Sequence, residues 1–172
     1  MALAFGQAPF GLRELKIVSQ DGTGAIALPV ALMLHFTERV QKEEFTAEGI
    51  LVASRSFCVG LDWELEAGAL DLAVYAKLTG RSAATAGITP NRTVTLDGNT
   101  GVDFPYVRIY GRAVGDAGTD DIHCRIYKAK LAAIEGTFRN GQFWVTSCAG
   151  VAVPDITFGV YEFVQHETAV VL

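Results

Sequence analysis

Charged residues are scarce in this chain. Only 19% of its 172 residues are charged and 50% are apolar, whereas an ordinary soluble domain carries roughly 25% charged residues. A chain of this length is expected to fold as one domain over residues 1–172 and to bury a sizeable core. So few charges cannot cover the surface of a single globule. The surplus apolar surface must therefore be hidden, either in a membrane or against other copies of the chain.

Long hydrophobic runs are also missing. The longest apolar stretch, 25–36, is interrupted by Pro29 and His35 and has about half of the ~20 residues that a membrane crossing needs. No charge precedes Arg13, and no cleavage site follows a hydrophobic stretch, so we expect no signal peptide. The sequence therefore predicts no membrane partner and favours self-association.

Cysteine is infrequent, and metal-ligand spacings are absent. Cys58, Cys124 and Cys148 are an odd number without a close pairing motif, which indicates reduced thiols of a cytosolic protein. His123 and Cys124 are adjacent, and neighbours on a strand point to opposite faces, so they cannot hold one metal together. Asp120-Asp121 lies in the segment "GDAGTDD", which we interpret as a turn because a calcium loop's glutamate is missing. We expect no metal and no cofactor.

Catalytic motifs are absent as well. The sequence has no G-x-S-x-G elbow and no glycine-rich phosphate loop with its lysine. Glu64 and Glu66 superficially resemble an acid–base pair, but carboxylates before a helix are explained by its dipole. His35 and His166 are isolated and are interpreted as packing or surface residues. We therefore expect that the protein is not an enzyme.

What is present is a strand pattern. It predicts a mainly β (α+β) fold, an antiparallel β-sandwich or barrel with one flanking α-helix. A hairpin tip is expected at Lys42-Glu43, and the segments 82–92 and 115–121 are expected to be loops. The expected strands are 12–19, 31–41, 44–57, 94–96, 106–114, 122–131, 142–148 and 156–165.

One helix is expected over 68–81, "GALDLAVYAKLTGR". Its core stripe recurs at helical spacing, and Gly80 suits the left-handed residue that ends a helix. Leu72 and Tyr75 lie off this stripe, so the helix is apolar nearly all round and must be covered on more than one side. We predict that Leu72 and Tyr75 contact another subunit. The stripe consists of Leu70, Val74 and Leu78.

A second unusual pattern lies in "IEGTFRNGQFWVTSCAG", residues 134–150. Asn140-Gly141 between apolar runs predicts a β-hairpin. The consecutive bulky residues 143–145 depart from the alternation of a half-exposed strand and need cover on both faces. A chain this short offers that cover most simply through a sister subunit, since obligate interfaces resemble a core cut in half.

Three segments carry a family resemblance: "RSFCVGLDWELEAGALDLAVYAKLTGR" (55–81), "KAKLAAIEGTFRNGQFWVTSCAGVAVPD" (128–155) and "YEFVQHETAVVL" (161–172). Together they resemble the major tail tube proteins of long, non-contractile-tailed bacteriophages. The strand–helix–"TGR" unit and the "EGTF–GQFWV" hairpin are the most specific parts.

The resemblance implies hexameric rings that stack into a hollow tube, through which the DNA genome passes without specific binding. It also implies a place in the virion tail after assembly in the host cytoplasm, with tail tip or baseplate, tail terminator and tape measure proteins as partners. The tube proteins of contractile tails and of type VI secretion are similar and remain alternatives. A further alternative is a soluble ligand-binding β-barrel whose aromatic residues line a pocket.

The two ends of the sequence are expected to contact neighbouring subunits. Residues 1–11 are interpreted as an arm anchored by Phe5 and Phe10, and residues 167–172 as a tail. Their apolar side chains predict that both ends become ordered only in the assembled state, because ordering costs about 1–2 kcal/mol per residue. In the tail, the interface candidates are Val170, Val171 and Leu172.

The net charge of −5 argues against a nucleic-acid binder, yet it suits a protein that lets nucleic acid pass. A basic lumen would hold the DNA that it has to release, so carboxylates are expected to line it. Glu38, Glu44 and Glu48, at polar positions of the first long hairpin, are the lumen candidates.

Overall fold

The computed structural model describes residues 9–28, 30–48, 50–68, 72–98, 103–115, 119–137, 140, 145–168 and 170–172. Within them lie ten strands and one helix, and the strand pairs are antiparallel. The mainly β fold with one helix is therefore confirmed. The strands are β1 Pro9–Ser19, β2 Ile26–Leu28, β3 Ala31–Ala47, β4 Ile50–Ala67, β5 Ala83–Ala86, β6 Thr93–Leu96, β7 Tyr106–Gly115, β8 Thr119–Thr137, β9 Val145–Ala152 and β10 Tyr161–Thr168, and the helix is α1 Leu72–Thr79.

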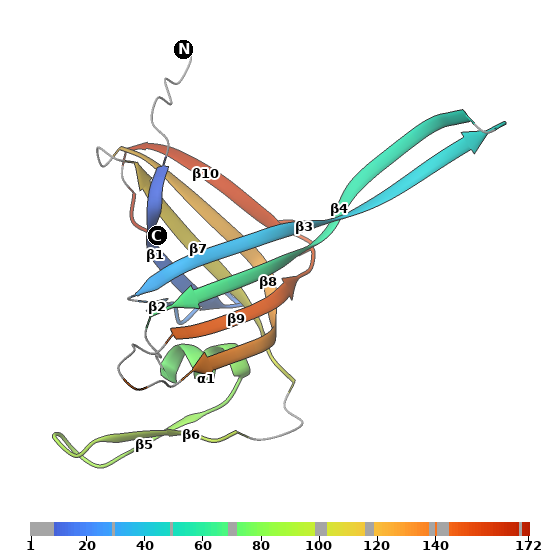
Figure 1. Cartoon of the computed structure of the whole chain (residues 1–172). Coiled ribbons are helices and arrows are strands. Elements are labelled where there is room, and N and C mark those ends of the chain that lie inside the picture. The colour runs from blue at the N-terminus through green and yellow to red at the C-terminus, as the bar shows by residue number, and fades with distance from the viewer. Residues whose placement is uncertain are drawn as a thin grey trace.

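Eight strands form one curled sheet (Figure 1). Seven of them follow the order β2-β1-β7-β8-β9-β4-β3, and the eighth, β10, lies beside β8. β10 pairs with the first half of β8, and β9 pairs with its second half. The sheet closes partly on itself, because β3 at one end of the order contacts β1 near the other. β5 and β6 form a separate two-stranded hairpin below the helix.

The core lies inside this curl and follows the period of two expected of strands. In β4 the residues Leu61, Trp63 and Leu65 are at most 2% exposed, and they alternate with acidic residues. Glu64 and Glu66 are therefore the polar positions of a strand, not carboxylates at a helix start as expected. The alternation of "LDWELEA" is the signal that distinguishes a half-buried strand from a helix entry.

Trp63 finds its place because β9 offers small residues opposite it. Trp63 pairs in register with Gly150, and a Cβ added at Gly150 would lie 2.1 Å from the Lys130 carbonyl oxygen and 2.5 Å from the indole. The glycine thus lets the largest core side chain and a neighbouring backbone approach at one point. The buried positions of β9 are Thr146, Cys148, Gly150 and Ala152.

The expected tip of the first hairpin is wrong. Lys42 pairs with Ser56 and Glu43 with Arg55 inside the ladder, which continues to Ala47 and Ile50. Glu48 takes the turn with a φ of 51°, in the left-handed region. Two adjacent charged residues can lie inside a solvent-exposed strand, so Lys42-Glu43 did not by itself indicate a turn.

Four other segments also differ from expectation. The segment 82–92 contains β5, the expected loop 115–121 includes the start of β8, and β1 begins inside the expected arm, so residues 9–11 belong to the sheet. The last strand begins at Tyr161, because the Asp155 side chain caps a tight turn through the N–H groups of Thr157 and Phe158. Ile156 in that turn is fully exposed.

The helix is shorter than expected, and its end is confirmed. It begins at Leu72 and ends at Thr79, and Gly80 has a φ of 68°, the left-handed conformation that suits glycine after a helix. Leu70 lies outside the described residues. The hairpin of residues 134–150 is confirmed by the pairing of Thr137 with Val145, while the bulky residues 143–144 lie outside the described part.

Candidate assembly surfaces

β3 and β4 continue far beyond the sheet as a two-stranded hairpin (Figure 1). β4 pairs with β9 only between Leu61 and Ala67, but with β3 as far as Ile50. Over residues 40–47 and 50–58, which we call the outer hairpin, each strand pairs only with the other within the described chain. Both of its edges therefore carry N–H and C=O groups that another chain can pair with.

Large apolar side chains gather at the far end of this hairpin. Phe45 is 63% exposed, Ile50 is 69% exposed, and Leu51 and Val52 also expose more than half of their surface. We call these four residues the hairpin tip. Glu48 is the one charged residue in the sequence from 45 to 52. The hairpin tip is thus an exposed apolar surface, and the only charge beside it is Glu48 in the turn.

Charged groups lie midway along the outer hairpin. Lys42 forms an ion pair with Glu44, and Arg55, opposite Glu43, stacks over the ring of Phe57 at 5.5 Å. Exposed ion pairs of this kind contribute only about 0–1 kcal/mol. They keep the middle of the hairpin solvated and do little to hold it together.

The three lumen candidates lie on or next to this hairpin. Glu38 accepts a hydrogen bond from the Tyr161 hydroxyl, which, together with burial, raises the pKa of Tyr161. Glu44 is paired with Lys42, and Glu48 occupies the turn. Alternation along β3 puts Glu38 and Glu44 on one face, but the structure does not gather the three carboxylates at one place. Their role in lining a lumen remains a prediction.

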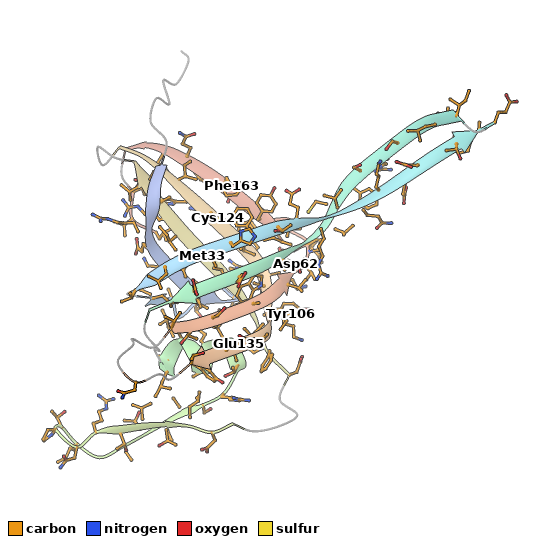
Figure 2. The ribbon with its side chains drawn as sticks, in the orientation of Figure 1. Met33, Asp62, Tyr106, Cys124, Glu135 and Phe163 are labelled. Carbon is orange, nitrogen blue, oxygen red and sulfur yellow. The ribbon has the colours of Figure 1, made fainter. Side chains whose placement is uncertain are left out.

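The helix separates its two kinds of apolar residue. Val74 and Leu78 are buried in the core, whereas Leu72 and Tyr75 are half-buried and line an open cleft of about 500 Å³. Val74 and Leu78 are thus core residues as predicted, and the contact of Leu72 and Tyr75 with another subunit stays a prediction. The cleft lies between α1, β6 and the facing parts of β8 and β9, and Glu135 marks its β8 side in Figure 2. Its other lining residues are Arg81, Val94, Thr95, Leu96, Gly98, Ile134, Gly136 and Thr146.

A smaller hollow of about 300 Å³ opens where β3 crosses β1, β7, β8 and β10. We call it the apolar groove. Phe36 and Phe163 form an aromatic pair in it, with ring centroids 5.4 Å apart, and Phe163 remains 51% exposed. Phe163 of β10 pairs in register with Cys124 of β8, and both are labelled in Figure 2. The lining is uncharged and consists of Gly11, Leu12, Leu34, Phe36, Gly111, Ala113, Ile122, Cys124 and Phe163.

A polar layer covers the opposite face of the same strands. Asp121 in β8 is fully buried and receives Arg112 of β7, with a guanidinium nitrogen 2.7 Å from its Oδ2. Arg112 also lies 3.7 Å from Glu14 of β1, which pairs with Lys16 at 2.9 Å. The expected turn at Asp120-Asp121 is therefore wrong, since Asp121 is a buried partner of a β7 arginine.

This layer holds residues 170–172 against the sheet. The Val170 N–H donates to Asp121 at 2.8 Å, the His123 Nε2 lies 3.0 Å from the Val170 carbonyl, and Lys16 donates to the Leu172 carbonyl at 2.6 Å. The expectation that the tail becomes ordered only on assembly stays a prediction. Val171 nevertheless remains 72% exposed, so its role as an interface residue stays a prediction.

His166, which was expected to be isolated, lies beside His123 in this layer. The rings of His123 and His166 are 4.5 Å apart, and His123 is 1% exposed. Burial lowers the pKa of His123, and His166 lowers it further. Burial alone would raise the pKa of Asp121, but the Val170 N–H and the Arg112 guanidinium outweigh it and hold that pKa below its usual value.

The remaining candidates are at the start of the chain. Phe5 lies outside the described residues. Phe10 belongs to β1, where its backbone pairs with Val114, but its side chain is not described. Their proposed contacts with neighbours remain predictions.

The thiols offer little reactivity. Cys124 and Cys148 are buried, which raises their pKa to about 12 and about 11, and Cys58 is exposed on β4. His123 and Cys124 are adjacent on β8 and are both buried. Within the described residues no group of three His, Cys, Asp or Glu side chains could hold a metal. The same residues contain no helix with the length and apolarity of a bilayer crossing.

Sequence reasoning missed the hairpin tip and the apolar groove for different reasons. The tip was divided between two strands by the misplaced turn, although "FTAEGILV" has a glycine between two apolar ends. The groove is lined by residues from five strands, and no local sequence pattern predicts that these residues lie together. Comparison with protein-family models gives no match, and comparison with curated protein sequences gives none either.

Proposed function

We propose that this chain is a structural subunit that assembles with copies of itself into stacked hexameric rings, forming the tail tube of a long, non-contractile-tailed bacteriophage. The rings enclose a lumen through which DNA passes during ejection. The resemblance of residues 55–81, 128–155 and 161–172 to major tail tube proteins suggests the kind of assembly. The outer hairpin is the structural observation that supports self-association.

The argument from the outer hairpin concerns its stability. An isolated two-stranded hairpin is at best marginally stable in water, and this one extends without a third strand within the described chain. The four tip side chains are 53–69% exposed. Burying about 400 Å² of them at about 25 cal/mol/Å² gives on the order of 10 kcal/mol before the costs of association, which cancel much of it. A partner that covers the outer hairpin therefore gains binding free energy and also stabilises the folded hairpin.

Long edge strands without a neighbour are normally blunted because they aggregate. A chain that keeps such edges, with an apolar tip and few charges overall, is suited to a defined polymer. The contact is heterologous, since the hairpin of one copy meets a different surface of the next. Such contacts close into a ring where the rotation permits.

The test is assembly of the purified chain and of a double variant, Phe45→Ser with Ile50→Ser. Size-exclusion chromatography and negative-stain microscopy should show rings or tubes for the unaltered chain. The variant should remain a monomer of unchanged circular dichroism, because both side chains are exposed. In the control variant Ile88→Ser, the apolar side chain that is removed is 84% exposed and lies outside the outer hairpin, so this variant should assemble normally.

A chain that stays monomeric at high concentration, under every salt and crowding condition tried, would overturn the proposal. The second candidate is then a soluble β-barrel that binds a small apolar ligand in the groove, which its aromatic lining favours. A hydrophobic fluorescent probe displaced by the ligand, and excluded by Ala113→Trp, would identify that function.

A further inference from the structure

The apolar groove needs an occupant. Its lining has no charged side chain, and Phe163, one of the lining residues, is 51% exposed. At Gly11 of β1 no atom lies within 4 Å of an added Cβ, so the groove is open there, whereas the Leu34 side chain already covers Gly111 of β7. A site of this shape and chemistry accepts a bulky apolar side chain better than it accepts water.

The hairpin tip has the complementary chemistry. It is apolar, it projects from the body of the molecule, and its only charge, Glu48, is in the turn. The larger cleft beside α1 is a poorer receptor, because Arg81 and Glu135 line it and an apolar knob would remove their solvent.

The groove and the tip of one copy cannot meet. β3 contributes Leu34 and Phe36 to the groove and Phe45 to the tip. Nine residues separate Phe36 from Phe45, about 30 Å along a strand. The pairing with β4 continues through this stretch and keeps it extended. Any contact between the two surfaces is therefore between different copies.

Building on the proposed function, we infer that the hairpin tip of each subunit docks into the apolar groove of the next. Phe45 packs against Phe36 and Phe163 of the receiving copy, and Ile50 and Leu51 cover the open end of the groove at Gly11. Each copy both gives a tip and receives one, so the contact is heterologous and repeats around a ring or along a filament.

The experiment is cysteine cross-linking between differently labelled copies. One batch carries Thr46→Cys beside the tip, which keeps Phe45, and the other carries Ala113→Cys in the groove. Both carry Cys58→Ser, because Cys58 is the exposed native thiol, and Cys124→Ala, because Cys124 lines the groove. The buried Cys148, with a raised pKa, reacts slowly. After mild oxidation, the mixture should yield at least tenfold more disulfide dimer than either batch alone.

A matched control replaces the groove cysteine with Thr95→Cys in the cleft, which is exposed. Cross-linking to this position instead of Ala113→Cys would overturn the inference and assign the tip to the cleft. Rings or tubes with neither cross-link would also overturn it while leaving the proposed function standing. The absence of any assembly would reject the proposed function itself.

A charge swap provides a second, independent measurement. Phe45→Lys should abolish assembly because it places an ammonium group in an apolar groove. Adding Ala113→Glu in the same chain should restore it, because each tip then meets a carboxylate in the next copy. Restoration by Thr95→Glu, and not by Ala113→Glu, would reject the groove as the receptor.

Discussion

At the residue scale, the contact between Trp63 and Gly150 fixes how β4 lies on β9. We predict that Gly150→Ala destabilises the fold, because its methyl group would lie 2.1 Å from the Lys130 carbonyl and 2.5 Å from the indole. Overpacking in a core costs about 1–3 kcal/mol, and a rigid backbone neighbour places this case at or above that range. Urea unfolding should show the loss. Gly98→Ala, with no atom within 4 Å of the new methyl, should unfold like the parent chain, and equal effects would contradict the packing argument.

Also at the residue scale, His123 gives stability a dependence on pH. Its Nε2 must donate to the Val170 carbonyl, which leaves Nδ1 buried without a partner within the described residues. Burial lowers the folded-state pKa, so the unfolded chain binds protons first. Stability is then full above the unfolded value of about 6.5 and falls as pH drops below it.

Thermal unfolding of the assembly-deficient Phe45→Ser background at pH 7.5 and 5.5 should therefore show a lower midpoint at pH 5.5. Adding His123→Gln should reduce the difference between the two pH values, because a glutamine does not titrate. Adding His35→Gln, at an exposed position of β3, should leave the difference unchanged. A pH difference that survives His123→Gln would assign it to other groups in the polar layer.

At the element scale, α1 carries two apolar faces with different roles. We predict that Leu72→Glu harms assembly more than folding, since Leu72 lines the open cleft outside the core. Leu78→Ala should instead cost about 2–5 kcal/mol of folding stability, because Leu78 is 1% exposed. The measurements are unfolding curves and negative-stain counts of assembled particles. Normal tube formation by Leu72→Glu would show that this face has no partner.

Elements also show how far the sequence predicts the structure. The sequence predicts most strands of the sheet, because a strand with one buried face alternates apolar and polar residues. In β4 the buried Leu61, Trp63 and Leu65 alternate with acidic residues in this way. The hairpin tip was misplaced, since no buried face constrains the outer hairpin and turn chemistry alone had to locate it. β10 was begun five residues early, because the apolar residues before it belong to a turn that the Asp155 side chain caps.

At the scale of the whole molecule, the candidate surfaces were less predictable than the fold. Surplus apolar surface was evident from composition, but its location depends on which strands lie on the outside. The groove requires β3 to cross β1, β7, β8 and β10, and that closure is tertiary. The polar layer was missed for the same reason, because Arg112, Asp121 and His123 meet only once β7 pairs with β8.

The last prediction concerns the lumen of the assembled tube. Six copies at −5 carry about −30 per ring, so the wall should repel DNA, which has about one negative charge per 1.7 Å of axis. We predict that assembled tubes bind no DNA at physiological salt. Changing Glu38, Glu44 and Glu48 to lysine takes each chain from −5 to +1 and should produce salt-dependent binding and slower ejection while sparing assembly. Filter binding of labelled duplex to sedimented tubes measures the first effect.

The position of the charges, and not their sum, decides between a lumen and an outer wall. Glu43, Glu64 and Glu135 are also exposed, and their replacement by lysine changes the net charge by the same amount. Glu43 neighbours Glu44 on β3 but points to the opposite face of the strand. If the first set lines the channel, only that set should slow ejection, because DNA inside the tube touches its inner wall. Equal slowing by both sets would mean that net charge alone acts, and slowing by the second set alone would reject the first set as the lining of the lumen.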